Sequence, residues 1–430
     1  MKFQIAAILL ALTSAAHAEG RKLTLAGAID LALSKNPDIA VAAENRSAAS
    51  SRESSVRAKR WFSIGINAAL NEYTEPFALD FAGMPFVIHA QGTTVSNVVL
   101  SQPITGFAYL SELVGAASHD TAAASAEYDR ARLDAAYSTA DTYVRALEAH
   151  ASAEVSERLV SDIDADLKRA ETLRAADTLT NVDVLRLQSA KAAAEQTAVR
   201  SDTSQTSSLA KLAVTIGLHD GDVVEISDDL PAQPPALAMT LDAAIERAIA
   251  ARPELRVASE RIAASGNITT SKWEQYVPAI NAIAAWQHTT GLEPFQPANE
   301  EYIGLQVQWK VWDWGSIRDD YKEAVAHENA AKISAVSLGD HVRLEVRTRW
   351  LEAQAGFKNL ATAQTQLQSA EEAYRLQKVK YENGVATTTD VLDAESDVAR
   401  ARLQSALARY DYYLALIGLA RSVGDIPSVK

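Results

Sequence analysis

Leu23-Thr24-Leu25-Ala26-Gly27-Ala28-Ile29 recurs in similar form as Met239-Thr240-Leu241-Asp242-Ala243-Ala244-Ile245, at an offset in numbering of 240 − 24 = 216. Asn36-Pro37 and Arg252-Pro253 keep the same offset. A second match joins Asp183-Val184-Leu185 with Asp390-Val391-Leu392, at an offset of 390 − 183 = 207. Internal similarity over this length predicts two units of similar fold, related by a pseudo-two-fold axis. We expect residues 19–219 and 239–420 to be structural repeats, each with a short helix, two strands and a long helix pair.

The N-terminus, residues 1–18, has the pattern of a secretory signal peptide. Lys2 precedes an apolar run over residues 5–12, and Ala16-His17-Ala18 supplies the small residues of a cleavage site. The exported chain has no cysteine, so packing or assembly has to hold it together instead of disulfides. A formal net charge of −14 argues against nucleic acid as a partner.

Two further segments lie outside the repeats. Residues 220–238 carry three prolines among acidic residues, which is typical of a linker. Residues 421–430 form a C-terminal tail. We expect the linker and the tail to wrap around the middle of the molecule.

Four stretches, three of them with heptad spacing, predict unusually long helices. Over residues 107–176 there is no proline, and apolar side chains recur at intervals of three and four residues, as in Leu133, Ala136, Ala140, Tyr143 and Leu147. A helix of this length extends about 100 Å. The other three cover about 182–216, 315–382 and 388–417, with Gly217 and Gly418 expected to end the two return helices. Helices this long belong to coiled coils.

Four stretches predict strands. The clearest is 303–311, whose odd-numbered residues are all apolar while the even-numbered ones are glycine, glutamine or lysine. Period two with one apolar face is typical of a half-buried strand, or of a barrel strand between lipid and water. We expect the others at 62–70, 280–286 and 95–102, the last with poor alternation. The alternative is a fragment of a soluble β-sandwich, which leaves two hairpins without a partner sheet.

The strand count predicts an assembly. A barrel needs about eight strands to close, and open sheet edges are not tolerated in lipid. Four strands per chain therefore require two chains for eight strands, or three for twelve. No stretch of the mature chain reaches the roughly 18 consecutive apolar residues of a helical membrane span. We expect a short barrel in an outer membrane, with the helices projecting from it as a tube.

Residue types that usually carry catalysis or bind metals form no pattern. Of the eight histidines, His17 falls in the signal peptide, and the others are scattered without ligand spacing. There is no phosphate-binding loop and no G-x-S-x-G motif. We therefore expect no enzyme activity, no cofactor and no metal site.

Two motifs resemble a known family. The segment from Tyr381 to Ala394 has Gly384 and ends in Asp390-Val391-Leu392-Asp393-Ala394, which resembles the Y-x-x-G and D-V-L-D-A motif of the TolC-type outer-membrane efflux proteins. Val311-Trp312-Asp313-Trp314-Gly315 resembles the family's junction between strand and helix, although Trp314 replaces a usual small residue. The order of elements resembles that family over nearly the whole mature chain.

The resemblance implies a mixed α and β membrane protein: a homotrimer with a twelve-stranded outer-membrane barrel and an α-helical coiled-coil tunnel across the periplasm. It implies outer-membrane lipid, a periplasmic adaptor protein and an inner-membrane pump as partners. The implied function is the exit duct of a tripartite efflux system for small molecules or ions. Two alternatives stay open: the exit duct of a type I protein-secretion system, and a structural periplasmic coiled coil without a pore.

Asp390 and Asp393 are the candidate periplasmic gate. Their spacing puts both carboxylates on one face near a helix start. By resemblance, three copies bring six carboxylates to the tunnel entrance, where such a ring favours cations and raises some carboxylate pKa values. The alternative is that Asp390 only stabilises the first turn of its helix, as Asp183 does at the matching place in the first repeat.

Tyr381 and Asp183 are a candidate link that closes this gate, because the resemblance implies a bond between them. Tyr381 alternatively fills the heptad seam seven residues after Tyr374. The family has a second tie, between a basic residue and a threonine, at positions where this chain has Ala386 and Val182. That tie cannot form here, so we expect a lower barrier to opening. We expect the helix tips to contact the adaptor through Thr178, Leu179, Gly384 and Val385, although the first tip lacks the glycine; the alternative is solvated turns.

Overall fold

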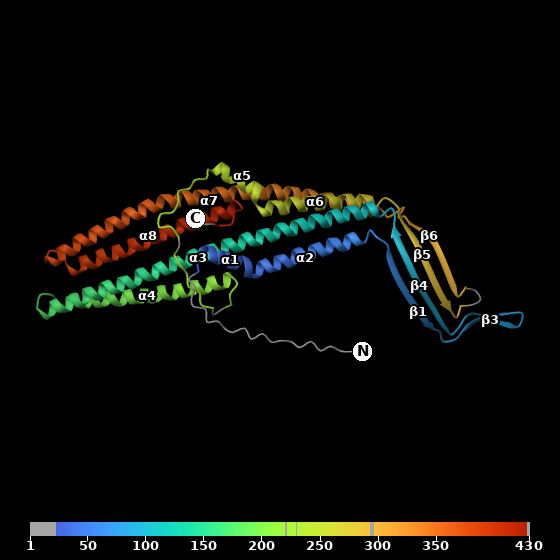
Figure 1. The fold of residues 1–430 in the computed structure, drawn as a ribbon, viewed down its shortest axis with the longest axis horizontal. Coiled ribbons are helices and arrows are strands. Elements are labelled where there is room, and N and C mark those ends of the chain that lie inside the picture. The colour runs from blue at the N-terminus through green and yellow to red at the C-terminus, as the bar shows by residue number, and fades with distance from the viewer. Residues whose placement is uncertain (1–22, 220–221, 229, 293–295, 428–430) are drawn as a thin grey trace, which may run out of the picture.

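The computed structural model describes residues 23–219, 222–228, 230–292 and 296–427 of the 430-residue chain. The predicted signal peptide lies outside the described residues, as do residues 220, 221 and 229 of the predicted linker and 428–430 of the predicted tail. The described chain is elongated, with a sheet at one end and the tips of two helix pairs at the other (Figure 1). None of its described helices is long and apolar enough to cross a membrane.

Helices make up most of the molecule. Two short helices are α1 (Leu25–Lys35) and α5 (Leu241–Ala251), and two of intermediate length are α2 (Pro37–Ala58) and α6 (Pro253–Glu274). The long pairs are α3 (Phe107–Ala175) with α4 (Asn181–Thr215), and α7 (Ser316–Glu382) with α8 (Thr388–Ser422). Threonine hydroxyls cap α1, α4, α5 and α8, and proline lies in the first turn of α2 and α6, where a missing N–H is tolerated.

The predicted long helices are confirmed to within one residue, except at the end of α8. The prediction that Gly418 ends this helix was wrong, because α8 continues to Ser422 and Gly424 takes the left-handed conformation with φ of 88°. Gly217 follows α4, and its offset from Gly424 is 424 − 217 = 207, so Gly424 is its true counterpart. Gly418 lies inside the helix against Arg349 of α7, with 3.4 Å between an added Cβ and Cδ of the arginine.

Four strands form one antiparallel sheet in the order β1-β4-β5-β6. They are β1 (Ser63–Glu72), β4 (Gly92–Pro103), β5 (Ala279–Thr290) and β6 (Asn299–Gln308). The register puts most of the apolar side chains on one face, among them Ile64, Ile66, Val98, Leu100, Trp286, Ile303, Leu305 and Val307. The opposite face is more polar, and Asn67 Nδ2 donates to Asn97 Oδ1 across it at 2.9 Å. The two predicted hairpins therefore join through β4 and β5 into a single sheet.

One predicted strand end was wrong, and one hairpin was not predicted. β6 ends at Gln308, so Trp309 and Val311 do not belong to it, because the chain there turns into the junction with α7. Trp309 Nε1 donates instead to the backbone carbonyl of Tyr276 at 3.3 Å. The unpredicted hairpin has two strands, β2 (Phe77–Phe81) and β3 (Met84–His89), and projects beyond the sheet (Figure 1).

The element bounds show where this hairpin enters the chain. The starts of α5 and α6 are offset from those of α1 and α2 by 241 − 25 = 216 and 253 − 37 = 216, and β5 is offset from β1 by 279 − 63 = 216. The offset falls to 299 − 92 = 207 for β6 and β4, and to 388 − 181 = 207 for α8 and α4. The drop in offset falls between β1 and β4, at the place of the β2–β3 hairpin.

The helices continue the strands in the same order. α2 leads into β1, β4 into α3, α6 into β5 and β6 into α7, while α2 packs on α3, α3 on α6 and α6 on α7. In the half remote from the sheet, α4 and α8 lie beside α3 and α7 (Figure 1). The molecule is therefore a curved wall of side-by-side elements rather than a closed body.

The main apolar core lies at the waist, where the short helices meet the long ones. Most of its buried side chains come from α1, α3, α4 and α8, among them Ile29, Tyr143, Leu147, Leu212, Tyr413 and Ile417, and it also includes Ile216, the C-cap of α4, and Leu230 of the linker. The hydroxyl groups of Tyr412 and Tyr413 donate to the carbonyls of Pro235 and Pro231, each at 2.8 Å. The described part of the linker is thereby held against the waist.

Candidate functional site: the helix tips

The two helix pairs end in tips of the same backbone conformation, at the end of the molecule opposite the sheet (Figure 1). At the second tip, Gly384 has a φ of 72°, and the N–H groups of Gly384 and Val385 donate to the carbonyls of Tyr381 and Lys380 at 3.0 and 2.9 Å. This is the Schellman arrangement, which satisfies carbonyls at a helix end.

The first tip makes the same turn without a glycine. Asp177 has a φ of 58°, and the N–H groups of Asp177 and Thr178 donate to the carbonyls of Arg174 and Leu173 at 2.9 and 3.0 Å. The Thr178 hydroxyl also donates to Leu173 O at 2.7 Å. Asp177 occupies the place that matches Gly384, since their offset is 384 − 177 = 207. Aspartate is among the few residues that tolerate this conformation. The missing glycine therefore leaves the tip geometry unchanged.

Asp390 completes a capping box at the start of α8. Its Oδ2 accepts hydrogen bonds from the Thr387 N–H at 2.8 Å and from the Thr387 hydroxyl at 2.7 Å. In return, the Asp390 N–H donates to Thr387 Oγ1 at 3.3 Å. The bonds from the Thr387 backbone and hydroxyl lower the pKa of Asp390, whereas a ring of like charges was expected to raise it. In the single chain, the capping role of this carboxylate is the one that is visible.

The other predicted gate residues lie close by but are not joined to one another. Asp183 accepts a hydrogen bond from the hydroxyl of Thr180, the N-cap of α4, and Asp393 is exposed one turn into α8. The Tyr381 hydroxyl lies 3.5 Å from Thr388 Oγ1. Within the described residues no hydrogen bond joins Tyr381 to Asp183, so the link between them stays a prediction about the assembled gate.

Two other contacts do connect the helix pairs near the tips. Arg186 Nη1 of α4 donates to Thr389 Oγ1 of α8 at 3.0 Å, and Arg169 Nη1 of α3 lies 3.5 Å from Glu382 Oε1 of α7. Neither pair was predicted from the sequence. Arg186 and Thr389 adjoin the repeated Asp-Val-Leu stretches, but nothing in one sequence shows that positions so far apart along the chain are neighbours.

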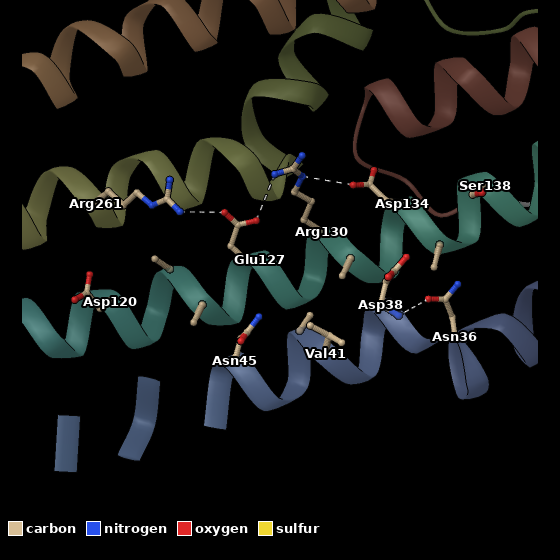
Figure 2. A pocket seen from close by; sticks show the side chains of 15 residues that line it. Asn36, Asp38, Val41, Asn45, Asp120, Glu127, Arg130, Asp134, Ser138 and Arg261 are labelled. Atoms are coloured by element: carbon tan, nitrogen blue, oxygen red, sulfur yellow. Dashed lines mark hydrogen bonds and ion pairs between the residues drawn. The ribbon is translucent and has the colours of Figure 1, made fainter. Parts of the chain in front are cut away.

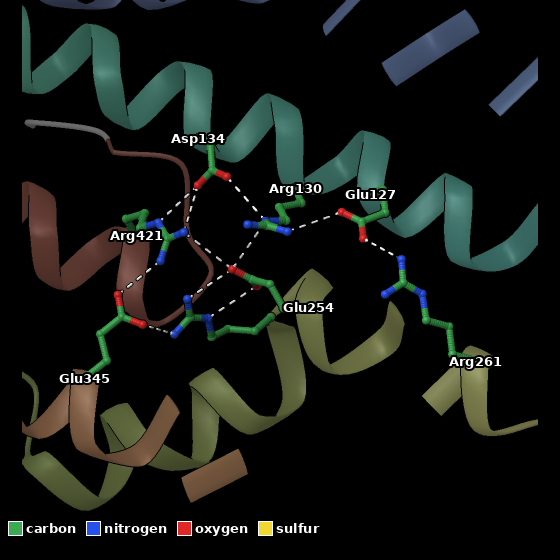
Figure 3. Close-up of polar contacts among 8 residues, drawn as sticks. Glu127, Arg130, Asp134, Glu254, Arg261, Glu345 and Arg421 are labelled. Carbon is green, nitrogen blue, oxygen red and sulfur yellow. Dashed lines mark hydrogen bonds and ion pairs between the residues drawn. The ribbon is translucent and has the colours of Figure 1, made fainter. Parts of the chain in front are cut away.

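An extended ion-pair network joins the two halves at the waist (Figure 3). Arg421 of α8 donates to Asp134 of α3 at 2.9 Å and to Glu345 of α7 at 3.0 Å. Arg252, only 3% exposed, donates to Glu254 at 3.1 Å and also to Glu345. Burial opposes ionisation of Glu254, but hydrogen bonds from Arg252 and from its own backbone, with the charge of Arg421, leave its pKa lowered. The network therefore holds this partly buried carboxylate ionised and ties α3, α6, α7 and α8 together.

A surface groove lies between α2 and α3, with Arg261 of α6 in its lining (Figure 2). Both arginines that line it pair with Glu127, which accepts from Arg261 at 3.3 Å and from Arg130 at 3.4 Å. The arginines of the groove are thus held by its own carboxylates. Among the described residues, no group of three or more histidine or acidic side chains is arranged to hold a metal ion.

Comparison with known proteins gives one family and one fold. A family model described as outer membrane efflux protein matches residues 28–218 and 244–425. The chain is similar to the solved outer-membrane channel OprN, with a TM-score of 0.81 and 20% identity, over 94% of this chain and 91% of that one. It is also similar to the CmeC outer membrane channel of Campylobacter jejuni, with a TM-score of 0.78 and 14% identity, over 93% and 85% of the two chains.

The outer membrane protein VceC of Vibrio cholerae has the same fold, with a TM-score of 0.78 and 18% identity over 93% of this chain and 96% of that one. A comparison with curated protein sequences gives no significant match. Identities this low show the fold alone, so the roles of individual residues have to be argued from this chain.

Proposed function

The chain belongs to the outer membrane efflux protein family, and from this premise we propose that three copies form the exit duct of a tripartite efflux system. The duct carries small molecules or ions from an inner-membrane pump, through a periplasmic adaptor protein, to the outside. Its location is the outer membrane, with the helical part in the periplasm. A membrane channel of this kind performs no catalysis.

The two-faced sheet is the observation that carries this proposal. Ile66, Leu70 and Ile303 on the apolar face are 76%, 80% and 89% exposed in the single chain. Large exposed apolar surfaces mark contacts with a membrane or with another protein. A barrel strand presents one such face to lipid and its polar face to a wet lumen. The alternative of a structural coiled coil without a pore gives this apolar face no role.

The sheet edges support a closed assembly of several copies. Among the described residues, β1 and β6 each pair on one side only, which leaves two open edges. Unpaired backbone groups are too costly in lipid, so β1 of one copy has to pair with β6 of another. Two copies would give eight strands, whose interior is filled by side chains, whereas three give twelve and leave a lumen.

The closure of the sheet into a barrel also implies closure of the helices into a periplasmic tunnel. Because α2, α3, α6 and α7 follow the strand order, three walls closed edge to edge continue the barrel as a tunnel. Apolar side chains of α7 stay exposed in the single chain, with Ile333 at 71% and Val336 at 68%. A neighbouring copy would cover them. The tips then surround the inner opening, where Asp390 and Asp393 form the gate and Thr178, Leu179, Gly384 and Val385 face the adaptor.

Electrical recording tests this proposal. The purified protein is inserted into a planar bilayer, and ion current is measured under a fixed voltage. We expect discrete conductance steps that favour cations over anions, because the entrance carries carboxylates. Absence of any conductance step, in protein whose circular dichroism shows the expected helix content, would contradict the proposal. A type I secretion duct would conduct in the same way, and co-purification with the pump of each system distinguishes the two.

A further inference from the structure

Glu395 is a buried carboxylate between the two helix pairs, about two turns into α8. The residue is 4% exposed, and neither carboxylate oxygen has a hydrogen-bond partner within the described structure. α8 packs here against α7 of its own pair and against α3 of the other pair. An ionised carboxylate is strongly disfavoured at such a site, because it has lost water without gaining a partner.

The charged and titratable groups around Glu395 come from three helices. They are Arg158, Asp162 and Asp166 of α3, Tyr374 and Lys378 of α7, and Arg402 of α8. The cations among them are engaged elsewhere: Arg158 with Glu154 at 3.3 Å, Lys378 with the Tyr374 hydroxyl at 3.4 Å and Arg402 with Glu371 at 3.3 Å. We call the contact between the α3–α4 and α7–α8 pairs the seam. Asp162 and Asp166 lie across it, and they are therefore the neighbours that an ionised Glu395 would repel.

Burial, and then the negative charges of Asp166 and Asp162, raise the pKa of Glu395 to about 7, against a smaller opposing effect of Lys378. The carboxyl group is therefore neutral in mildly acidic solution and gains its charge near neutral pH. The same change brings a third negative charge to the seam between the helix pairs.

We propose that Glu395 is a proton-binding site that keeps the α3–α4 and α7–α8 pairs in contact when protonated and forces them apart when ionised. The proposal rests on the duct function above, since separation of the pairs at their tips widens the inner opening. It adds proton control to the gate, at a residue deeper in the seam than Asp390 and Asp393.

The direction of the pH dependence follows from linkage. In the separated state Glu395 meets water, and its pKa returns towards the ordinary value of 4.5. Between this value and about 7 the closed state binds more protons than the open state. Raising the pH through this window favours opening, by up to about tenfold per pH unit.

Conductance as a function of pH, from 5 to about 8, is the first test. For the wild type we expect the open fraction to rise with pH. Glu395→Gln stays neutral, so it should stay closed and lose this rise. Asp397→Asn is the matched control, because it removes an exposed carboxylate two residues along the same helix and should keep the wild-type rise. If Glu395→Gln and the wild type have the same pH profile, the proposal is wrong.

A distance measurement tests the seam without relying on ion flow. The chain has no cysteine, so Ser161→Cys of α3 and Ser396→Cys of α8, both at exposed positions, accept spin labels without background. We expect the distance between the labels to lengthen between pH 5 and about 8, and to stay constant when Glu395→Gln is added. A constant distance in the otherwise wild-type chain would overturn the proposal.

The double variant Asp162→Asn, Asp166→Asn covers the case in which Glu395→Gln does not fold. Removing both repelling charges should shift the midpoint of opening to higher pH, because ionised Glu395 then meets less repulsion. An unchanged midpoint contradicts the proposal. A duct that conducts without pH dependence refutes this inference alone. A protein that never conducts refutes the duct function, and the spin-label distances then still test whether ionisation of Glu395 separates the two helix pairs.

Discussion

At the scale of single residues, the tip turns depend on one backbone conformation that Gly384 and Asp177 share. Apart from its two neighbours along the chain, no residue has an atom within 4 Å of a Cβ added to Gly384. The cost of Gly384→Ala is therefore conformational, and we expect the free energy of unfolding to fall by roughly 1 kcal/mol. Denaturant titration in detergent, followed by circular dichroism, measures it.

Gly339 provides the matched control for this substitution. It lies inside α7, and an added Cβ would meet only Arg343 Nη1, at 3.7 Å. Gly339→Ala should therefore stabilise the protein, by roughly 0.5 kcal/mol, because alanine is the better helix former. Equal effects of the two substitutions would show that Gly384 does not need its left-handed conformation.

Asp390 and Asp393 differ in what their substitution should change. Asn retains a side-chain oxygen that accepts hydrogen bonds, so Asp390→Asn and Asp393→Asn should both reduce the cation preference of the duct without loss of helix content. Asp390→Ala should in addition weaken the start of α8 by breaking the capping box. Reversal potentials and circular dichroism measure the two effects separately. Unchanged ion selectivity in both Asn variants would leave Asp390 with the capping role only.

The capping role of Asp390 has its own pH dependence. The folded pKa of this carboxyl group is lowered, so its contribution to stability is fully present above the ordinary aspartate value. It is lost as the pH falls through the lowered folded pKa. This is opposite in sign to Glu395, whose raised pKa favours the closed seam at low pH. The two acids therefore act in separate pH ranges.

At the scale of elements, the waist network should matter more than the many ion pairs on helix surfaces. Arg252→Ala removes the buried one of the two arginines that Glu254 and Glu345 share, while Arg421 stays in place. We expect a loss of about 2 kcal/mol in the free energy of unfolding, because hydrogen bonds to charged groups are lost. Arg400→Ala is the control, because its pair with Asp397 is exposed and is worth below about 0.5 kcal/mol. Denaturant midpoints in detergent compare them. Similar midpoints would mean that the network is no stronger than a surface pair.

The two faces of β6 make a second prediction at this scale. Leu305 lies on the apolar face and Gln306 on the polar face. Leu305→Lys should cost about 2 kcal/mol in lipid, because it places a charge against the bilayer. Gln306→Lys, at the next position, should be tolerated and change only the ion selectivity. The yield of folded protein in lipid vesicles compares them, and a tolerated Leu305→Lys would place this face away from lipid.

Elements were predictable to different degrees, and the reason lies in the length of their periodic signal. Four long helices show many heptads, so their bounds were found to within a residue at every end but one. The C-terminus of α8 was predicted too early because Gly418 was taken as the end of the helix, although a helix tolerates a single glycine. The β2–β3 hairpin was missed, although the change in repeat offset from 216 to 207 already required extra residues in the first repeat.

At the scale of the whole molecule, the single chain is an open wall. We expect detergent-extracted protein to have three times the mass of the mature chain, measured by analytical ultracentrifugation or native mass spectrometry. The reason is that the exposed apolar face and the open edges of β1 and β6 find partners only in other copies. A stable monomer would contradict the closure argument, and a dimer would give eight strands without a lumen.

The sequence by itself determined the four long helices at every end but one, the four strands of the sheet with their two faces, and the family, because each depends on local periodicity or on a contiguous motif. Only the tertiary structure decided that β4 pairs with β5, that Arg186 meets Thr389, and that Glu395 is buried beside Asp162 and Asp166. These are contacts between segments that lie far apart along the chain. No periodicity along one chain records such contacts, since they arise from how the two halves pack against each other.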